Sequence, residues 1–544
     1  MASSAPPPRP RPERPPQRTP QPARELTPTD RLLAALGGIV AGFGGLAVAA
    51  LVGVPVRPEA GPVPAVGDAV VDQTPAGVKE WAIRTFGESD KAVLEFGILV
   101  LLGALAAALG VLALRSRAAA LAGVIGLGAV GALAAVTRPD SDSAADVLPS
   151  LLGAAAAAAL LYVLTGRLLG PSPSLDAGAA RRGFLLTAAG VAAGAAGATV
   201  LARSVGSTRS QHATASRNAL RLPRPASAAP AVPPGAQLPV EGISPFVTPN
   251  RDFYRVDTAL VVPRVDADTW RLRVHGSGVT GEWSFTLADL LRREVIERDI
   301  TLACVSNEVG GSLVGNARWL GVRLADLLRE CGVRPPSAGG PADQLVARSV
   351  DGMTIGTPVE TVLDGRDALL AFGMNGEPLP FAHGFPVRMV VPGLYGYVSA
   401  CKWISSIELT TFAAYDAYWV PRGWAAQAPV KTQSRIDTPR AFGHATAGQV
   451  AVAGVAWAQH RGISRVQVRV DDGPWQDAEL GAEDSTDTWR QWLLRWQATP
   501  GRHTLTVRAT DGTGAVQTEQ RTGTMPDGAT GLHTVTVTVD AASG

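Results

Sequence analysis

Ile300-Thr301-Leu302-Ala303-Cys304-Val305-Ser306-Asn307-Glu308 is the central stretch of this chain. A largely apolar, β-prone run leads to a single cysteine, a Gly-containing turn follows, and an amphipathic helix is predicted to begin near Arg323. This order would place a thiol at the end of a strand, at the edge of a cleft. The local sequence alone favours a plain core cysteine, because free cysteine is among the most buried residue types.

A second set of motifs changes this interpretation. It consists of Asn375-Gly376-Glu377-Pro378-Leu379-Pro380, then His383-Gly384-Phe385-Pro386-Val387-Arg388-Met389-Val390-Val391-Pro392-Gly393, then Ala400-Cys401-Lys402-Trp403-Ile404. Together with the central stretch, these motifs resemble the molybdenum-cofactor domain of the sulfite oxidase family, from about Pro245 to the C-terminus. The resemblance implies that Cys304 is the metal ligand and a catalytic residue, and that the cofactor is molybdenum-molybdopterin.

The chemistry of the residues agrees with the resemblance. A soft thiolate suits a thiol-rich molybdenum centre, and histidine, arginine and lysine offer the donors that a pterin and its phosphate need. Arg255 is also expected to be catalytic, facing an oxyanion substrate, although a surface charge is the alternative. For Asp351, a purely structural role as a turn residue before Gly352 is an equally good interpretation. The residues that the resemblance assigns to the cofactor are Tyr254, Arg255, Asp351, His383, Arg388, Ser399, Ala400, Cys401 and Lys402.

The central stretch departs from the family at the substrate side. The sulfite and nitrate enzymes carry Cys-Ala-Gly-Asn-Arg-Arg, and here Glu308 and Val309 replace the two arginines. A dianion such as sulfite needs several charge-assisted donors, so this change weakens a sulfite assignment. Arginines from elsewhere in the fold are candidates to compensate, namely Arg318, Arg422 and Arg435.

Composition excludes nucleic acid as an expected partner and favours a membrane protein. The net charge is only +2, from 49 basic and 47 acidic residues, and the chain is 46% hydrophobic but only 6% aromatic. Its three cysteines, Cys304, Cys331 and Cys401, cannot build a disulfide framework. A bridge between Cys331 and Cys401 is left open.

Five apolar segments precede the cofactor region, and each has about the 20 residues that a membrane helix needs. Basic residues at alternate ends place the N-terminus in the cytoplasm and the catalytic domain outside, in a multi-pass protein of the cell membrane. Arg181-Arg182 before the last segment resembles a twin-arginine export signal, or is a simple topology anchor. The segments are Leu32 to Val56, Val93 to Leu114, Ala118 to Val136, Val147 to Leu164 and Phe184 to Ala202.

The predicted fold class is multidomain. A disordered cytoplasmic tail (1–30) precedes the five transmembrane helices (31–205) and a flexible linker (206–239). An α+β molybdopterin domain of the sulfite oxidase type (240–440) follows, and an all-β sandwich (441–544) ends the chain. The sandwich resembles the immunoglobulin-like dimerisation domain of the family, which leaves a homodimer open.

The expected function is two-electron oxygen-atom transfer by a membrane-anchored, sulfite oxidase-like enzyme acting on a small oxyanion. Within the fold, the alternative is a reductase of sulfoxides, N-oxides or nitrate. From another class, the alternative is a non-catalytic surface adhesion protein. The electron-transfer partner is unknown, because the sequence contains no His-Pro-Gly-Gly haem segment.

Overall fold

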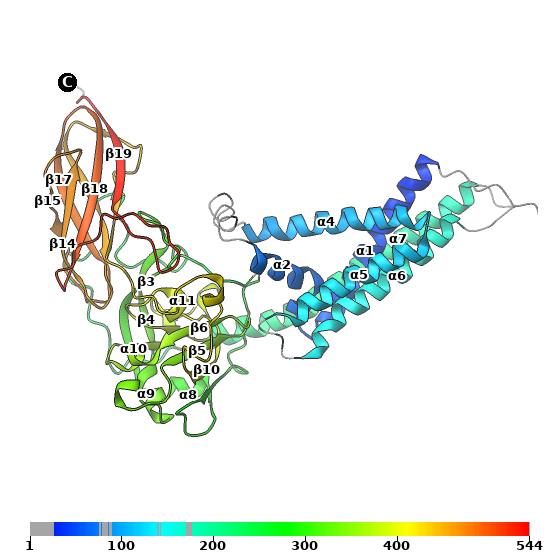
Figure 1. Ribbon diagram of the computed structural model, residues 1–544, viewed down its shortest axis with the longest axis horizontal. Helices are drawn as coiled ribbons and strands as arrows, with labels where there is room; N and C mark the ends of the chain where they lie inside the picture. The colour runs from blue at the N-terminus through cyan, green and yellow to red at the C-terminus, as the bar shows by residue number, and fades with distance from the viewer. Residues whose placement is uncertain are drawn as a thin grey trace, which may run out of the picture.

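A computed structural model describes residues 27–74, 78, 85, 90–138, 141, 143–169, 177–259 and 261–542. These form three regions, which Figure 1 shows as a helical bundle (blue to teal), a mixed α/β region (green to yellow) and a β-rich region at the C-terminus (orange to red). This order of regions is the predicted one. The predicted disordered tail lies outside the described residues except for its last four, with which the first helix begins.

The five predicted apolar helices are all present, and each contains a stretch long and apolar enough to cross a membrane. Large apolar side chains on their surfaces, such as Phe96 (69% exposed) and Leu186 (69% exposed), are typical of helices that face lipid. The helices are α1 (Pro28–Gly53), α4 (Asp90–Ala113), α5 (Arg117–Val136), α6 (Leu148–Leu169) and α7 (Ala177–Ala219).

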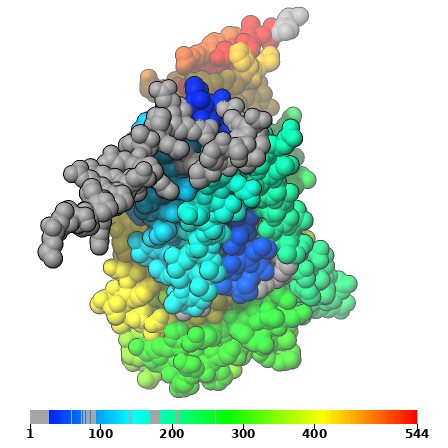
Figure 2. Space-filling view, turned by 90° about the vertical axis from the view of Figure 1, so that its right-hand side faces the viewer, coloured from blue at the N-terminus to red at the C-terminus, as the bar shows by residue number. Residues whose placement is uncertain are grey.

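Helix α1 is the central helix of the bundle and contacts α4, α6 and α7. Small residues allow the close approach: a Cβ added to Gly45 would lie 2.6 Å from the carbonyl oxygen of Gly153 on α6. The view in Figure 2 faces the bundle, with the α/β region beneath it and the β-rich region above and behind.

Two helical features differ from the prediction. A short helix, α2 (Pro62–Gln73), follows α1 and was not predicted. Helix α7 continues through the predicted flexible linker as far as Ala219. Residues 207–219 contain neither glycine nor proline, and the next proline is Pro223, so nothing in this stretch ends the helix.

The rest of the predicted linker is not a free spacer either. Ala226 donates its backbone N–H to Val295, and Ser227 forms a parallel bridge with Ile296. The chain between α7 and the α/β region is therefore bonded to the α/β region, which differs from the flexible linker predicted over 206–239.

The α/β region contains two sheets, one mixed and the other antiparallel. One has the order β2-β1-β10-β5-β6 and the other β3-β4-β7-β8, with β9 paired to β7. Their strands are β1 (Arg271–Gly276), β2 (Trp283–Thr286), β3 (Val295–Ala303), β4 (Val314–Arg323), β5 (Gln344–Ser349), β6 (Thr354–Pro358), β7 (Leu369–Met374), β8 (Glu377–Pro378), β9 (Arg388–Val390) and β10 (Ile404–Thr410).

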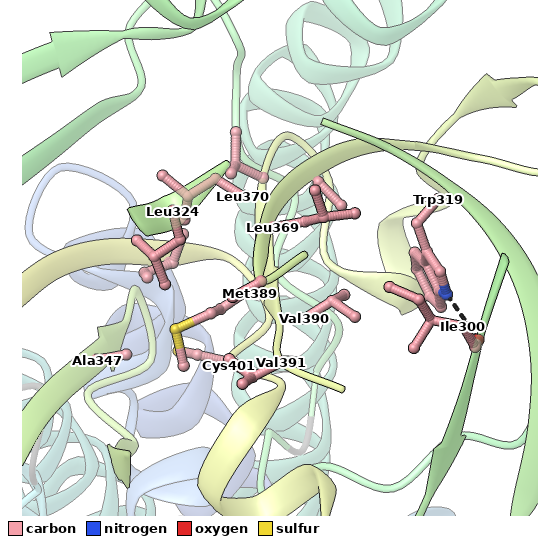
Figure 3. Close-up of a cluster of buried hydrophobic side chains, with 14 of the residues drawn as sticks. Ile300, Trp319, Leu324, Ala347, Leu369, Leu370, Met389, Val390, Val391 and Cys401 are labelled. Carbon is pink, nitrogen blue, oxygen red and sulfur yellow. Dashed lines mark hydrogen bonds between the residues drawn. The ribbon is translucent and has the colours of Figure 1, made fainter. Parts of the chain in front are cut away.

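Short helices connect these strands, and one of them was predicted, the helix that begins near Arg323. The region's core is apolar and fully buried: Figure 3 shows Trp319 with its indole N–H donating to the carbonyl of Ile300 over 3.0 Å, and Met389 beside Cys401. The helices are α8 (Leu287–Leu291), α9 (Leu324–Glu330), α10 (Val359–Leu363), the 3-10 turn η5 (Phe381–His383) and α11 (Gly396–Ser399).

The C-terminal region is a β-sandwich of two sheets with a common apolar core that includes Val452, Trp492 and Val537. One sheet contains β11 (Gln433–Thr438), β13 (Gly448–Trp457), β17 (Arg490–Ala498) and β16 (Glu479–Leu480). The other contains β12 (His444–Thr446), β19 (His533–Asp540), β18 (Gly501–Asp511), β14 (Ile463–Val470) and β15 (Gln476–Asp477).

The sandwich begins earlier than predicted. Strand β11 pairs with β13 although it precedes the predicted boundary at residue 441. The alternating pattern that marks the later strands is absent from this first strand, so the pairing could not be inferred locally.

Candidate functional site

Cys304 lies directly after strand β3, where the chain turns back towards β4. Its backbone N–H donates to Leu313 over 2.9 Å, and its carbonyl accepts from Asn307 over 3.1 Å. The side-chain oxygen of Asn307 accepts in turn from the N–H of Leu313 over 2.8 Å. The turn is thus hydrogen-bonded from both sides, which holds the thiol at a fixed place, only 8% exposed.

This thiol lines a cavity of about 780 Å³, counting its open side. The residues come from the segment before β1, from the ends of β3 and β5, from the β5–β6 turn and β6, from η5, β9 and α11, from the loop that follows α11, and from a later segment at Trp419. They are Phe253, Tyr254, Val256, Asp257, Thr258, Cys304, Ser349, Asp351, Met353, Ile355, His383, Arg388, Gly396, Tyr397, Ala400, Cys401, Lys402, Trp403 and Trp419.

His383 is held as a neutral imidazole. Its Nε2 lies 3.0 Å from the carbonyl oxygen of Asn250, so Nε2 carries the proton and donates it. Burial, followed by the nearby charge of Arg388, lowers the pKa of His383 to about 4. The other ring nitrogen, Nδ1, is therefore free of a proton and can accept a hydrogen bond.

Arg388 is buried and held by backbone oxygens. It donates to the carbonyls of His383 (3.2 Å) and Ala400 (3.4 Å), and its guanidinium lies 4.9 Å from the centre of the Trp319 ring. Burial lowers the pKa of Arg388 to about 10, yet the group stays charged at neutral pH. Its Nε has no partner, although buried polar atoms normally do.

Ser349 gives the cavity a second unsatisfied polar atom. Its side chain is 4% exposed, lines the cavity and has a hydroxyl with no hydrogen-bond partner. Buried polar atoms without partners are costly. Two of them on cavity-lining residues indicate a place for a ligand that has polar atoms of its own.

Lys402 supplies the second buried cation. Its Nζ donates to Asp257 over 2.8 Å, and Arg255 donates to the same carboxylate over 2.9 Å. Burial lowers the pKa of Lys402 to about 8, against the opposite effect of Asp257. The cavity therefore contains two buried cations, Arg388 and Lys402, and the charge of Lys402 is balanced by Asp257.

The structure brings most of the predicted site residues to this cavity, but not two of them. Arg255 does not line it and instead pairs with Asp257. The Ser399 hydroxyl donates to the carbonyls of Leu394 and Tyr395, both at 3.0 Å, behind the lining. Those that do line it are Tyr254, Cys304, Asp351, His383, Arg388, Ala400, Cys401 and Lys402.

The arginines expected to compensate for Glu308 and Val309 are held elsewhere. Arg318 pairs with Asp299, Arg435 pairs with Asp437, and Arg422 stacks on Tyr418. None of the three lines the cavity. Glu308 itself is exposed and also lies outside the lining.

Sequence reasoning missed Asp257, the counter-ion of Lys402. The available signal was its spacing, because residues two apart on an extended segment lie on one face, which puts Asp257 beside Arg255. It also left the state of the cysteines open. All three, Cys304, Cys331 and Cys401, are buried free thiols, so Cys331 and Cys401 are not bridged.

Comparison with known proteins assigns this region. Residues 259–419 match the family model described as oxidoreductase molybdopterin binding domain. The mitochondrial sulfite oxidase of Mus musculus is 32% identical over 318 residues, which cover 50% of this chain and 57% of that protein. This part of the chain is a molybdopterin-binding oxidoreductase domain, and it is similar to the sulfite oxidases.

Other relatives of the molybdopterin domain extend the comparison. Nitrate reductase [NADH] 1 of Oryza sativa subsp. japonica is 35% identical over 210 residues, covering 34% of this chain and 22% of that protein. Sulfane dehydrogenase SoxCD of Paracoccus pantotrophus aligns with 25% identity and a TM-score of 0.44, over 51% of this chain and 75% of that one. The chain spans about half the length of the curated sulfite oxidases that it matches.

The cavity fits the cofactor of this family, molybdenum-molybdopterin. It offers a soft thiol, two buried cations, a neutral histidine and two unsatisfied polar atoms. Within the part of the chain that the structure describes, no group of three or more His, Cys, Asp or Glu side chains is arranged to hold a metal ion. A metal that is bound by an organic cofactor needs no such group, because the cofactor supplies most of the ligands and the protein supplies only one sulfur.

Proposed function

We propose that the chain is a membrane-anchored molybdopterin oxidoreductase that transfers an oxygen atom to or from a small substrate in a two-electron reaction. The observation that supports this most strongly is the cavity, which the Cys304 thiol lines together with two buried cations, Arg388 and Lys402. Bound molybdenum would supply the exchange of the oxygen atom and the two electrons. The side chains position the cofactor and the substrate.

Each cavity residue has a role in this proposal. Cys304 is the protein ligand of the metal, as thiolate. Burial raises the pKa of its thiol, so deprotonation depends on a nearby positive charge such as the metal itself. Arg388 and Lys402 bind the anionic and polar edges of the pterin and its phosphate, and Nδ1 of His383 accepts a hydrogen bond from it.

The remaining predicted residues contribute less directly. Tyr254, Asp351, Ala400 and Cys401 line the cofactor's place, and Ser399 fixes the loop behind it. Arg255 acts through Asp257, whose carboxylate it shares with Lys402. It is therefore a positioning residue, and the expected direct contact with an oxyanion is replaced by this indirect role.

The substrate is a small oxyanion such as sulfite, or a neutral oxide of the sulfoxide or N-oxide type. The second candidate is favoured by one observation: Arg388 is the only arginine among the residues that line the cavity. Aromatic side chains, Tyr397 and Trp419, line it as well. An uncharged sulfoxide needs fewer charged donors than a dianion does.

Steady-state assays separate these candidates. The purified full-length protein is assayed for sulfite oxidation with a soluble dye as acceptor, and for methionine sulfoxide or nitrate reduction with a reduced dye as donor. Cys304→Ser should abolish whichever activity is found, while Cys331→Ser, a buried free thiol away from the cavity, should retain it. Absence of pterin fluorescence after denaturation of the purified protein would support the adhesion alternative.

The membrane arrangement is part of the proposal. Arg115, Arg117, Arg167 and Arg182 fall at one end of the helices, which supports a cytoplasmic N-terminus and an extracytoplasmic catalytic domain, exported by a twin-arginine signal. The C-terminal sandwich is taken as an immunoglobulin-like dimerisation domain. Its exposed Phe442 (77%) is a natural contact residue, so Phe442→Asp should convert a dimer to a monomer in light scattering.

A further inference from the structure

The helical bundle contains a cavity of its own, separate from the catalytic one. It has a volume of about 930 Å³, counting its open side, and lies among α1, α2, α4, α5 and α6. Along α1 it extends from Gly38 to Ala49, about 16 Å at the helical rise per residue. Its walls are mostly glycine, alanine, leucine and valine, so its ligand must be mainly apolar.

One side chain in this cavity indicates a ligand with a polar group. Ser150, in the first turn of α6, lines the cavity, is 2% exposed, and its hydroxyl has no hydrogen-bond partner. Thr165 on the same helix is equally buried, but its hydroxyl donates to the carbonyl of Leu161 over 2.7 Å. The Ser150 hydroxyl is thus left free to bond to a ligand in the cavity.

Helix α2 lies between this cavity and the catalytic one. Its residues Pro62 and Val66 line the cavity in the bundle. Asp68 and Val71 of the same helix line a smaller cavity of about 400 Å³, together with residues of the catalytic region. Three of those, Thr258, Asp351 and Met353, also line the catalytic cavity.

The small cavity thus adjoins the catalytic one, and helix α2 separates it from the cavity in the bundle. A helix with its side chains is about 10 Å thick, so a redox group in the bundle would lie close to the catalytic side. Among the described helices of the bundle His212 is the only histidine, so they contain no pair of histidines to hold a haem.

We propose that the cavity in the bundle binds a lipid-soluble quinone, which exchanges electrons with the catalytic domain. The proposal rests on the proposed function. Oxidation of the substrate with an oxygen atom from water releases two electrons and two protons, and one quinone takes up both to become a quinol. Reduction of an oxide to the parent compound and water takes the same two electrons and two protons from a quinol.

The test uses the full-length holoprotein in quinone-free lipid nanodiscs, with 2,3-dimethyl-1,4-naphthoquinone as the probe. Ser150→Ala should weaken binding of the probe about fivefold, the value of one hydrogen bond. Thr165→Ala, which removes a buried hydroxyl already bonded within its own helix, should leave binding unchanged. Equal affinities for these two variants would contradict the role of Ser150.

A second pair of variants tests the cavity itself. A Cβ at Gly103 or at Gly97, both on α4, would meet open space, but only Gly103 lines the cavity. Gly103→Leu should abolish binding of the probe and substrate-driven reduction of the quinone, and Gly97→Leu should preserve both. Loss of neither, or a tightly held phospholipid that the quinone does not displace, would overturn the proposal.

Turnover with a soluble dye distinguishes this inference from the function on which it rests. All four variants should keep dye-linked turnover, because none of the changed residues lines the catalytic cavity. Dye-linked turnover without binding of the quinone would contradict the quinone site alone. Absence of dye-linked turnover in the native protein would contradict the proposed function.

Discussion

Lys402 and Asp257 form a buried ion pair, with Nζ and Oδ2 2.8 Å apart and side chains 11% and 3% exposed. The pair joins the loop after α11 to the segment before β1, so it fixes two walls of the catalytic cavity to one another. Arg255 binds the same carboxylate, which makes Asp257 the shared anion of two cations.

Asp257→Asn should destabilise the cofactor-free α/β region by about 3 kcal/mol, because it leaves Lys402 buried without its counter-charge. Chemical denaturation followed by tryptophan fluorescence measures the change. Adding Lys402→Met should restore much of the loss. Asp472→Asn, at an exposed turn, is the control, and an equal loss in both single variants would show that the pair is not an anchor.

Arg388→Lys should reduce the pterin content of the purified protein about tenfold or more. Lysine keeps the charge but cannot reproduce two donors to backbone oxygens together with stacking on Trp319. Pterin fluorescence after denaturation gives the content. Arg264→Lys changes an arginine that stacks on Phe381 outside the cavity and should have no effect. An unchanged pterin content in Arg388→Lys would show that Arg388 does not bind the cofactor.

Gly528→Ala tests how the C-terminal region supports the catalytic loop. The added Cβ would lie 2.7 Å from the hydroxyl oxygen of Tyr395, the residue before α11. Gly514 has a similar positive φ (88°, against 101°) but open space around it. Both variants have the strain of that backbone conformation, about 1 kcal/mol, and Gly528→Ala should lose at least about 1 kcal/mol more from the clash.

The activity of the two glycine variants gives a second measurement. Because α11 provides Gly396 and Tyr397 to the cavity, kcat/KM should fall in Gly528→Ala and stay near the native value in Gly514→Ala. Equal values for both would indicate that the C-terminal loop does not position the catalytic residues.

Asp484 predicts a pH-dependent stability. Burial, followed by the nearby charge of Asp299, raises the pKa of Asp484 to about 6. The folded state therefore favours the protonated acid, and this residue's contribution to stability falls as pH rises from about 4 to about 6. Asp484→Asn should add about 1 kcal/mol of stability above pH 6 and little below pH 4. Denaturation midpoints at pH 4 and pH 7 check this, and an equal effect at both would contradict it.

Much of the fold follows from local patterns. Apolar length alone locates the five long helices, because a run of some 20 apolar residues has few other uses. Alternation locates β14, β18 and β19, since one face of each strand is buried in the sandwich. Helix α2 escapes such patterns because it has only 12 residues and includes two prolines.

The extension of α7 was missed for a different reason. Its alanines, serines and arginines between residues 207 and 219 have the composition of a linker, yet they also favour helix once an upstream helix provides the nucleus. Composition does not distinguish these two outcomes, and the neighbouring structure does.

The site residues also divide into those that local sequence patterns predict and those that depend on the tertiary fold. Cys304, His383, Arg388 and Lys402 could be predicted because each lies in a motif of fixed spacing. Asp257 lies outside those motifs, and its meeting with Lys402 over a separation of 145 residues depends on the tertiary fold. Arg255 and Ser399 were predicted to contact the cofactor, but neither lines the cavity. A sequence motif does not show which side of a loop faces the cavity.

The central claim is that the sulfur of Cys304 binds molybdenum. X-ray absorption at the molybdenum edge counts sulfur ligands directly, and Cys401→Ser is a matched control because Cys401 lines the same cavity. Cys304→Ser should lose one sulfur from the metal relative to the native protein, while Cys401→Ser should lose none. An unchanged sulfur count in Cys304→Ser, or a native protein without molybdenum, would contradict the account.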